Sequence, residues 1–382
     1  MLDDTVLDDP DALSALDRGG LLRGAAEAGA LSRSAARLAT ESGLDELRPD
    51  GRPRALLVAG PGPSVGCAAE LLGAFTNGSV PVTPLRPSGA GASAAELRWT
   101  LPGWAGPVDL LLVLTHDGSE PGLVALAEQA YRRGCTVLAV APPTGAVSAT
   151  ISPPRGLAVP LATAPGAARL QHEVPDAEQS PMVPGGLWAL LTPLLLLTDR
   201  LGLGHTPPDA VQALATRLDE VAGRCGPAIP THENPAKSLA QELADALPLI
   251  WSETPVADAV GRHFATMLGA AAGRPAACAP LPEALVTHRA LLSGEFAGGR
   301  EDDIFRDRVE EPDALRALAV LLHERTPAAD SAAPAARELA HAHSAGVTEI
   351  EAQPASSPLE AAAELIATAD FAAVYLGLTP NP

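Results

Sequence analysis

The stretch VDLLLVLTHDGSEPGLVALAEQAYRRGCTVLAVA, residues 108–141, decides the fold. Its opening apolar run, residues 110–114, has the length and continuity of a buried strand. Apolar residues at helical spacing follow a polar turn and predict a helix that ends at Gly134. Residues 136–140 have the pattern of a second buried strand. A strand–helix–strand unit of this kind implies parallel pairing and a right-handed crossover.

The loop THDGSE, between this strand and helix, is the first candidate site. In parallel α/β units a ligand binds outside the carboxyl ends of the strands, at a helix N-terminus. Thr115 and Ser119 supply hydroxyls suited to phosphate oxygens, with Gly118 between them. Asp117 and Glu120 would instead repel a phosphate dianion. Simple capping of the following helix by Asp and Ser is an equally supported interpretation.

The composition limits the kinds of partner and compartment. A chain of 382 residues is long enough for two to three domains. The net charge of −20 argues against nucleic acid and anionic membranes as partners, because both require a basic face. Four widely spaced cysteines predict reduced thiols in a cytoplasmic protein without a metal or cofactor. The most hydrophobic segment, residues 185–198, is too short to span a bilayer and predicts a buried helix.

The order of predicted elements favours the α/β class with two tandem domains. Residues 51–165 alternate strands and helices as in a flavodoxin-like, doubly wound parallel sheet. Residues 166–382 repeat this alternation of strands and helices and form the second domain after a Pro- and Gly-rich junction. The apolar run at 317–322 fits helix and strand equally, whereas residues 358–378 predict a long closing helix. Helices within residues 1–50 are expected to pack on the first domain.

A glycine-rich turn, GPGPSVG at residues 60–66, follows a predicted strand and opens a helix. Gly62 and Ser64 are suited to the close approach of a phosphate. Pro61 and Pro63 each remove an N–H donor, however. A ligand-contacting turn and a plain tight turn are therefore equally supported.

The second half contains candidates for proton transfer. Glu283 and His288 lie five positions apart, and such a pair can orient and relay a proton. His232, Glu233 and Lys237 lie in the segment PAIPTHENPAK. Taken alone, residues of this kind are more often surface or supporting groups than catalysts.

Several motifs in order resemble the tandem sugar-isomerase (SIS) domain proteins of the bifunctional phosphoglucose/phosphomannose isomerase family. They are NPAK at 234–237, AVGRHF at 259–264, the PE…H element at 282–288 and DFAAVYL at 370–376. The resemblance implies two SIS domains, a homodimer and a sugar-phosphate ligand. It implies these ligand-binding residues: Gly62, Ser64, Thr115, Gly118, Ser119 and Lys237. It also implies a catalytic His288 that opens the sugar ring, and Glu283, five positions before it, is the second catalytic candidate.

The departures from the family pattern concern the groups that carry the reaction. Ala270 stands in the segment where the family has its catalytic Glu, and Met182 stands at the place of its catalytic Arg. Loss of a general base costs about 10²–10⁴ in rate, and loss of the oxyanion partner about 10²–10³ more. We therefore expect sugar-phosphate binding with weak or lost aldose–ketose isomerase activity. Two alternatives stay open: an active glucose-6-phosphate/mannose-6-phosphate isomerase with Glu283 or Glu233 as relocated base, and a scaffold or regulator without a ligand.

Overall fold

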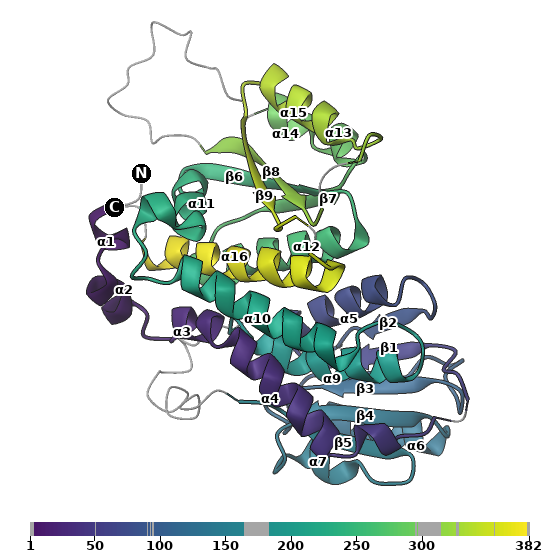
Figure 1. Ribbon diagram of the computed structural model, residues 1–382. Coiled ribbons are helices and arrows are strands. Elements are labelled where there is room, and N and C mark those ends of the chain that lie inside the picture. Colours follow the sequence, from purple (N-terminus) through teal and green to yellow (C-terminus); the bar gives the residue numbers. More distant parts are fainter. Residues whose placement is uncertain are drawn as a thin grey trace, which may run out of the picture. The chain divides into compact units, whose positions relative to one another are not determined.

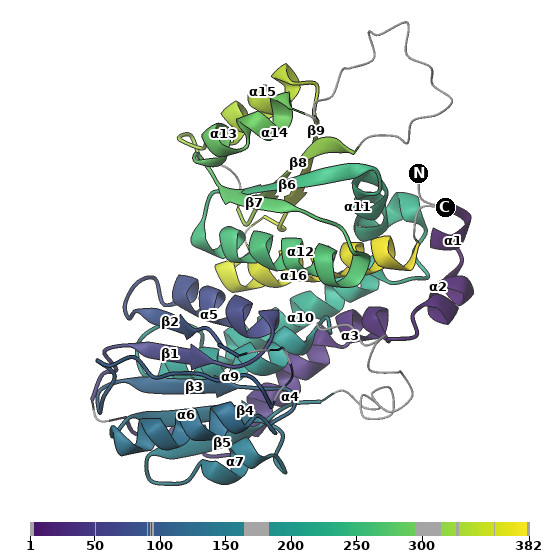
Figure 2. The same cartoon turned by 180° about the vertical axis from the view of Figure 1, so that it is seen from behind.

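The computed structural model contains two compact units, each built around one parallel sheet (Figures 1 and 2). It describes residues 4–49, 51–89, 91, 93, 95–163, 183–294, 296, 315–325, 328–354 and 356–379. The first unit comprises described residues between 27 and 219. The second unit comprises residues 4–26 together with the described residues from 220 onward.

The sheet of the first unit has the order β2-β1-β3-β4-β5, and all its strands are parallel. Its strands are β1 (Leu56–Ala59), β2 (Val82–Leu85), β3 (Leu110–Leu114), β4 (Thr136–Ala141) and β5 (Gly156–Pro160). The strand order reverses between β1 and β3, as in the flavodoxin-like fold predicted from the sequence. The carboxyl ends of β1 and β3 therefore form a topological switch point.

Helices cover both faces of this first sheet. Leu57, Leu111 and Val137 point to one face, where they pack with residues of α6 (Pro121–Arg132) and α7 (Ala146–Thr150). The other helices of the unit are α4 (Ala28–Glu41) with a 3-10 turn (Leu44–Glu46), α5 (Pro63–Phe75) and α9 (Gly186–Arg200). Both α4 and α5 contact α9, and α9 is buried along most of its length. The buried helix predicted at 185–198 is thus confirmed.

The sheet of the second unit has the order β7-β6-β8-β9 and is also parallel. Its strands are β6 (Ala246–Ser252), β7 (Ala277–Pro280), β8 (Arg316–His323) and β9 (Gly346–Glu351). The order reverses between β6 and β8, which makes a second switch point. The run at 317–322, ambiguous in sequence, is a central strand. Two parallel sheets flanked by helices confirm the predicted α/β class with two tandem domains.

Helices also cover both faces of the second sheet (Figure 1). Leu249, Trp251 and Leu321 face α13 (Ala284–Thr287), α14 (Arg289–Ser293) and α15 (Ala333–Ala342). The other face carries α11 (Pro235–Leu243), α12 (Pro255–Ala272) and α16 (Pro358–Leu378). The remaining elements are α1 (Asp4–Leu7), α2 (Pro10–Leu16), α3 (Leu21–Ala26), α10 (Pro208–Cys225) and a 3-10 turn (Thr231–Glu233).

Helix α16 is the central helix of the second unit. It is long and apolar enough to cross a membrane, but 89% of its apolar window is buried inside the structure. It packs against α11, α12 and α3. Its start is sharply defined, because Ser357 and Glu360 form a reciprocal capping box. Burial on all sides explains why its sequence lacks a polar face.

The unit boundaries differ from those predicted. Helices α1 to α3 belong to the unit of the second sheet, where α3 contacts α16, and not to the first domain. Helix α9 belongs to the unit of the first sheet, although the sequence placed it in the second domain. The division between units falls inside α10, a continuous helix, so no loop marks it in the sequence. The predicted boundary near residue 165 lies outside the described residues.

Candidate functional site

The turn between β1 and α5 brings two strand ends of the first sheet very close together. A Cβ atom on Gly60 would lie 1.9 Å from the carbonyl oxygen of Leu114, the last residue of β3. Only glycine is therefore possible at this position. Gly62 has φ 83°, a left-handed value that also favours glycine, and it precedes α5 without a side-chain cap. The glycine-rich turn thus sits at the switch point.

The first turn of α5 presents open hydrogen-bond donors. No hydrogen bond within the described residues uses the backbone N–H of Ser64, Val65 or Gly66, or the hydroxyl of Ser64. Pro63 occupies the first helical position, where a missing N–H removes only one of the unpaired donors. Helix N-termini with free N–H groups attract anions. This turn is therefore suited to a phosphate.

The loop after β3 is instead bonded to itself. The Thr115 hydroxyl donates to Oε1 of Glu120 at 2.6 Å. It accepts from the backbone N–H groups of Asp117 at 3.1 Å and Gly118 at 2.9 Å. The Ser119 hydroxyl donates to Oδ2 of Asp117 at 2.6 Å. The hydroxyls predicted to hold a phosphate are thus engaged within the loop.

Glu120 determines the chemistry of this loop. Its side chain precedes α6 and is 1% exposed, and its Oε2 is buried without a hydrogen-bond partner in the structure. The sequence predicted only that Glu120 would repel a phosphate. The structure adds that its carboxylate binds Thr115 and places a negative charge beside the switch point. This negative charge makes the start of α6 less suitable for an anion than the first turn of α5.

His288 lies in a buried position beside the second sheet. Its Nδ1 accepts a hydrogen bond from the indole Nε1–H of Trp251 at 2.9 Å, so the neutral ring carries its proton on Nε2. Burial lowers the pKa of His288 and favours this neutral form. Glu283 is exposed just before α13, and no hydrogen bond joins it to His288 within the described residues. The catalytic pairing of the two remains a prediction.

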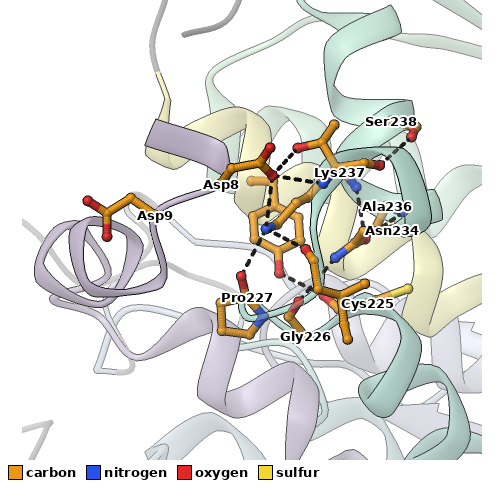
Figure 3. A network of polar contacts seen from close by, with 12 residues as sticks. Asp8, Asp9, Cys225, Gly226, Pro227, Asn234, Ala236, Lys237 and Ser238 are labelled. Atoms are coloured by element: carbon orange, nitrogen blue, oxygen red, sulfur yellow. Dashed lines mark hydrogen bonds and ion pairs between the residues drawn. The ribbon is translucent and has the colours of Figure 1, made fainter. Parts of the chain in front are cut away.

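Lys237 is completely buried, and Figure 3 shows its surroundings. Its Nζ donates to the carbonyl oxygens of Pro227 at 2.9 Å and Ile229 at 2.8 Å. It also lies 3.9 Å from Oδ1 of Asp8 and 5.6 Å from the centre of the Tyr375 ring. Burial lowers the pKa of Lys237, while Asp8 opposes that shift. This geometry gives Lys237 a structural role, because its ammonium group has no exposed side for a ligand.

The other residues of the NPAK motif are structural too. Asn234 accepts from the N–H groups of Ala236 and Lys237, both at 3.1 Å, and so caps α11. Its amide donates to the carbonyl of Gly226 at 3.1 Å (Figure 3). The Tyr375 hydroxyl donates to the carbonyl of Cys225 at 2.6 Å. The motif therefore holds the loop that leads from α10 into α11.

Ala270 and Met182 occupy the positions where the sequence lacks the expected catalytic Glu and Arg. Ala270 lies in the last turn of α12, which extends to Ala272. The helix there carries no ionisable side chain between residues 269 and 272. Met182 lies outside the described residues.

One group of side chains in the second unit has the composition of a metal site. Ligand atoms of His323, Glu349 and Glu351 lie within 4.8 Å of one another. Arg337 already binds both carboxylate oxygens of Glu349, at 2.5 and 2.8 Å, and lowers its pKa. A metal ion would have to compete with this guanidinium. The group is therefore best described as an ion-pair network that links β8, β9 and α15.

Comparison with known proteins places the chain among SIS-fold proteins. Residues 232–381 match the family model of the bacterial phospho-glucose isomerase C-terminal SIS domain. The structure resembles tagatose-6-phosphate ketose/aldose isomerase from Escherichia coli, with TM-score 0.58 and 11% identity over 94% of this chain and 92% of that chain. It also resembles a putative phosphosugar isomerase from Silicibacter pomeroyi, with TM-score 0.54 and 17% identity over 92% and 95% of the two chains. A glucose-6-phosphate isomerase like protein from Thermus thermophilus matches at 22% identity and TM-score 0.46, over 91% and 92%. No curated protein sequence matches the chain.

The structure has two parallel sheets, and in each the strand order reverses near the centre. Solved sugar-isomerase structures match more than nine-tenths of the chain. These features define an SIS fold. Residues 232–381 match the bacterial phospho-glucose isomerase C-terminal SIS domain, and the chain as a whole shares the fold of solved sugar-isomerase structures. The NPAK, AVGRHF and DFAAVYL motifs all lie in the matched segment, so the resemblance predicted from them is confirmed for residues 232–381.

Proposed function

We propose that the protein binds a sugar phosphate, or a related carbohydrate derivative, at the switch point between β1 and β3. The observation that carries the proposal is the set of open donors on Ser64, Val65 and Gly66. These groups lie where parallel α/β sheets bind their ligands. Because they are backbone N–H groups at a helix start, they favour an oxygen anion despite the acidic net charge.

We further propose that aldose–ketose isomerisation is weak or lost. The reaction moves a proton between neighbouring carbons and needs a base and a group that stabilises the oxyanion. The end of α12 supplies only Ala270 and its neighbours at the expected position of the base. The buried acidic group beside the switch point, Glu120, is bonded to Thr115. We also propose a cytoplasmic homodimer, whose assembly analytical ultracentrifugation would measure.

Calorimetric titration with glucose 6-phosphate, and with glucose for comparison, tests the binding. The phosphate ester should bind and glucose should bind at least about tenfold more weakly, a difference of about 1.4 kcal/mol. Ser64→Ala should weaken binding about threefold to tenfold through one lost hydrogen bond. Ser64→Asp should abolish binding by repulsion, whereas Ser152→Ala, an exposed control in the same unit, should not change it. Absence of binding for every hexose phosphate at millimolar concentration would rule out the proposal.

A coupled assay from fructose 6-phosphate measures the isomerase activity. We expect a rate on the order of 10²–10⁴ below that of a normal enzyme of this kind. A normal rate would favour the alternative of a relocated base. In that case Glu283→Gln and Glu233→Gln, made separately, would show which carboxylate carries the activity.

A further inference from the structure

We propose that a cavity in the second unit binds a small ligand that carries a primary ammonium group. The cavity has a volume of about 420 Å³, within the range of small-molecule sites. Most of its lining comes from the end of β8 and the segments that follow β6 and β8, the switch point of the second sheet, and Leu281 and Pro282 after β7 complete it. All lining residues belong to the second unit, so this site differs from the one proposed between β1 and β3.

At the helix that starts at this cavity after β8, the N–H groups of Ala332 and Ala333 already have acceptors. One carboxylate oxygen of Glu253 accepts from the backbone N–H of Ala332 at 2.6 Å, just before α15. The other accepts from the Ser331 hydroxyl at 2.7 Å. A carboxylate of the protein thus sits where an anionic ligand would meet the helix terminus.

The start of the helix after β6, α12, is likewise capped by a side chain of the protein. The Thr254 hydroxyl accepts from the N–H of Ala257 at 3.1 Å and so caps α12. It donates its own proton to Oε2 of Glu324 at 2.6 Å. Neither helix start therefore offers the capping position to a phosphate. This differs from α5 of the first unit, whose first turn is open.

The charges around the cavity favour a cation. Three carboxylates line it, those of Glu253, Glu324 and Asp330, against the single guanidinium of Arg325. Asp330 and Arg325 form no ion pair or hydrogen bond within the described residues. Because opposite charges attract most strongly where water is partly excluded, an ammonium group is favoured and a phosphate dianion is repelled.

A buried histidine points to the same kind of ligand. His323 lines the cavity and is 5% exposed. Its Nε2 is hydrogen-bonded to Glu349 at 3.0 Å, and an ionised carboxylate can only accept, so Nε2 carries a proton. In the neutral ring Nδ1 is then an acceptor, and it has no partner among the described residues. An N–H or O–H donor of the ligand would satisfy it.

An amino sugar combines the features that this lining requires. Its ammonium group supplies three donors for the carboxylates, and its hydroxyls can donate to His323 and accept from the exposed Arg325. A hexose ring also fits the size of the cavity. The inference concerns an unphosphorylated amine and does not depend on phosphate binding in the first unit.

Binding of glucosamine, glucose and N-acetylglucosamine to the full chain at pH 6.5 provides the test, by calorimetry or ligand-observed NMR. Glucosamine should bind at least about tenfold more tightly than the two uncharged sugars. Asp330→Asn and Glu324→Gln should each weaken glucosamine binding about threefold to tenfold. Glu338→Gln, an exposed carboxylate on α15 with the same charge change, is the matched control and should have no effect.

The outcomes separate this proposal from the proposed function. Ser64→Asp should leave glucosamine binding unchanged, and Asp330→Asn should leave glucose 6-phosphate binding unchanged. The inference is overturned if glucosamine does not bind at about 10 mM, or if the three sugars bind equally. It is also overturned if neither Asp330→Asn, whose side chain has no partner among the described residues, nor Glu324→Gln weakens binding. Circular dichroism of each variant checks that the fold is kept.

Discussion

The hydroxyl of Thr115 donates a 2.6 Å hydrogen bond to the buried carboxylate of Glu120, and this bond closes the loop after β3 upon itself. The same hydroxyl oxygen accepts from two backbone N–H groups, those of Asp117 and Gly118. A residue that could have faced a ligand is thus at the centre of a local network. Removing the Thr115 hydroxyl should therefore first lower the free energy of unfolding.

Thr115→Val keeps the shape of the side chain but removes its oxygen. It leaves the Glu120 carboxylate buried without a partner and two N–H groups without an acceptor. We expect a loss of about 2–4 kcal/mol in the free energy of unfolding, measured by urea denaturation. Ser152→Ala, whose hydroxyl is exposed, serves as the control. A loss below about 0.5 kcal/mol would show that this network does not stabilise the fold.

Glu120→Gln removes the charge and retains the size. The amide can still accept from Thr115, and a neutral group is less costly to bury, so stability should change little. Affinity for glucose 6-phosphate should rise about tenfold, equivalent to about 1.4 kcal/mol, because one negative charge near the switch point is lost. Calorimetry measures the affinity. An unchanged affinity would indicate that Glu120 does not influence anion binding.

Lys237→Met separates a structural from a ligand-binding role. The variant leaves the carbonyl groups of Pro227 and Ile229 without their donor, so we expect a loss of about 2–4 kcal/mol in unfolding free energy. Binding of glucose 6-phosphate by the folded variant should not change. The opposite result, with normal stability and lost binding, would show that Lys237 contacts the ligand.

His288 should make stability depend on pH. Burial lowers its folded-state pKa below the unfolded value of about 6.5, so the unfolded chain binds the proton more readily. The stability that the neutral ring contributes is present above about pH 6.5 and decreases as pH falls towards the lowered folded-state pKa. His288→Gln can still accept from Trp251, and urea denaturation at pH 7 and pH 5 should show a smaller decrease than in the unchanged protein. An identical decrease would contradict this assignment.

The DFAAVYL and AVGRHF motifs meet in a buried pair between α12 and α16. Nε2 of His263 and Oδ1 of Asp370 lie 2.7 Å apart, and both residues are buried. Asp370→Ala should cost about 3–5 kcal/mol, because it removes one partner of a buried pair. Asp370→Asn keeps an acceptor oxygen and should cost less. Equal losses for the two variants would show that packing, and not the hydrogen bond, holds the helices together.

Several elements were predictable because their signals are local. The apolar run of β3 and the bounds of α16 agree with the sequence prediction, since a buried strand or core helix must be apolar throughout. By contrast, β7 and α15 were missed, because β7 is only four residues long and the buried face of α15 consists mainly of alanine, which gives a weak hydrophobic signal. Of the predicted site residues, Thr115 directly follows β3 and Ser64 lies in the first turn of α5. The roles of their hydroxyls could not be inferred from their position alone.

The sequence by itself determined the fold class, the longest strands and helices and the resemblance to SIS domains, because hydrophobic periodicity and short motifs can be recognised in the sequence alone. Only the tertiary structure decided which polar groups are free. Glu120 turns inward to Thr115, Asp8 of the N-terminal segment lies beside Lys237, and the acidic cavity is lined by segments that follow separate strands. The physical reason is that hydrogen bonding and burial depend on neighbours in space, and those neighbours are set by how the sheets and helices pack.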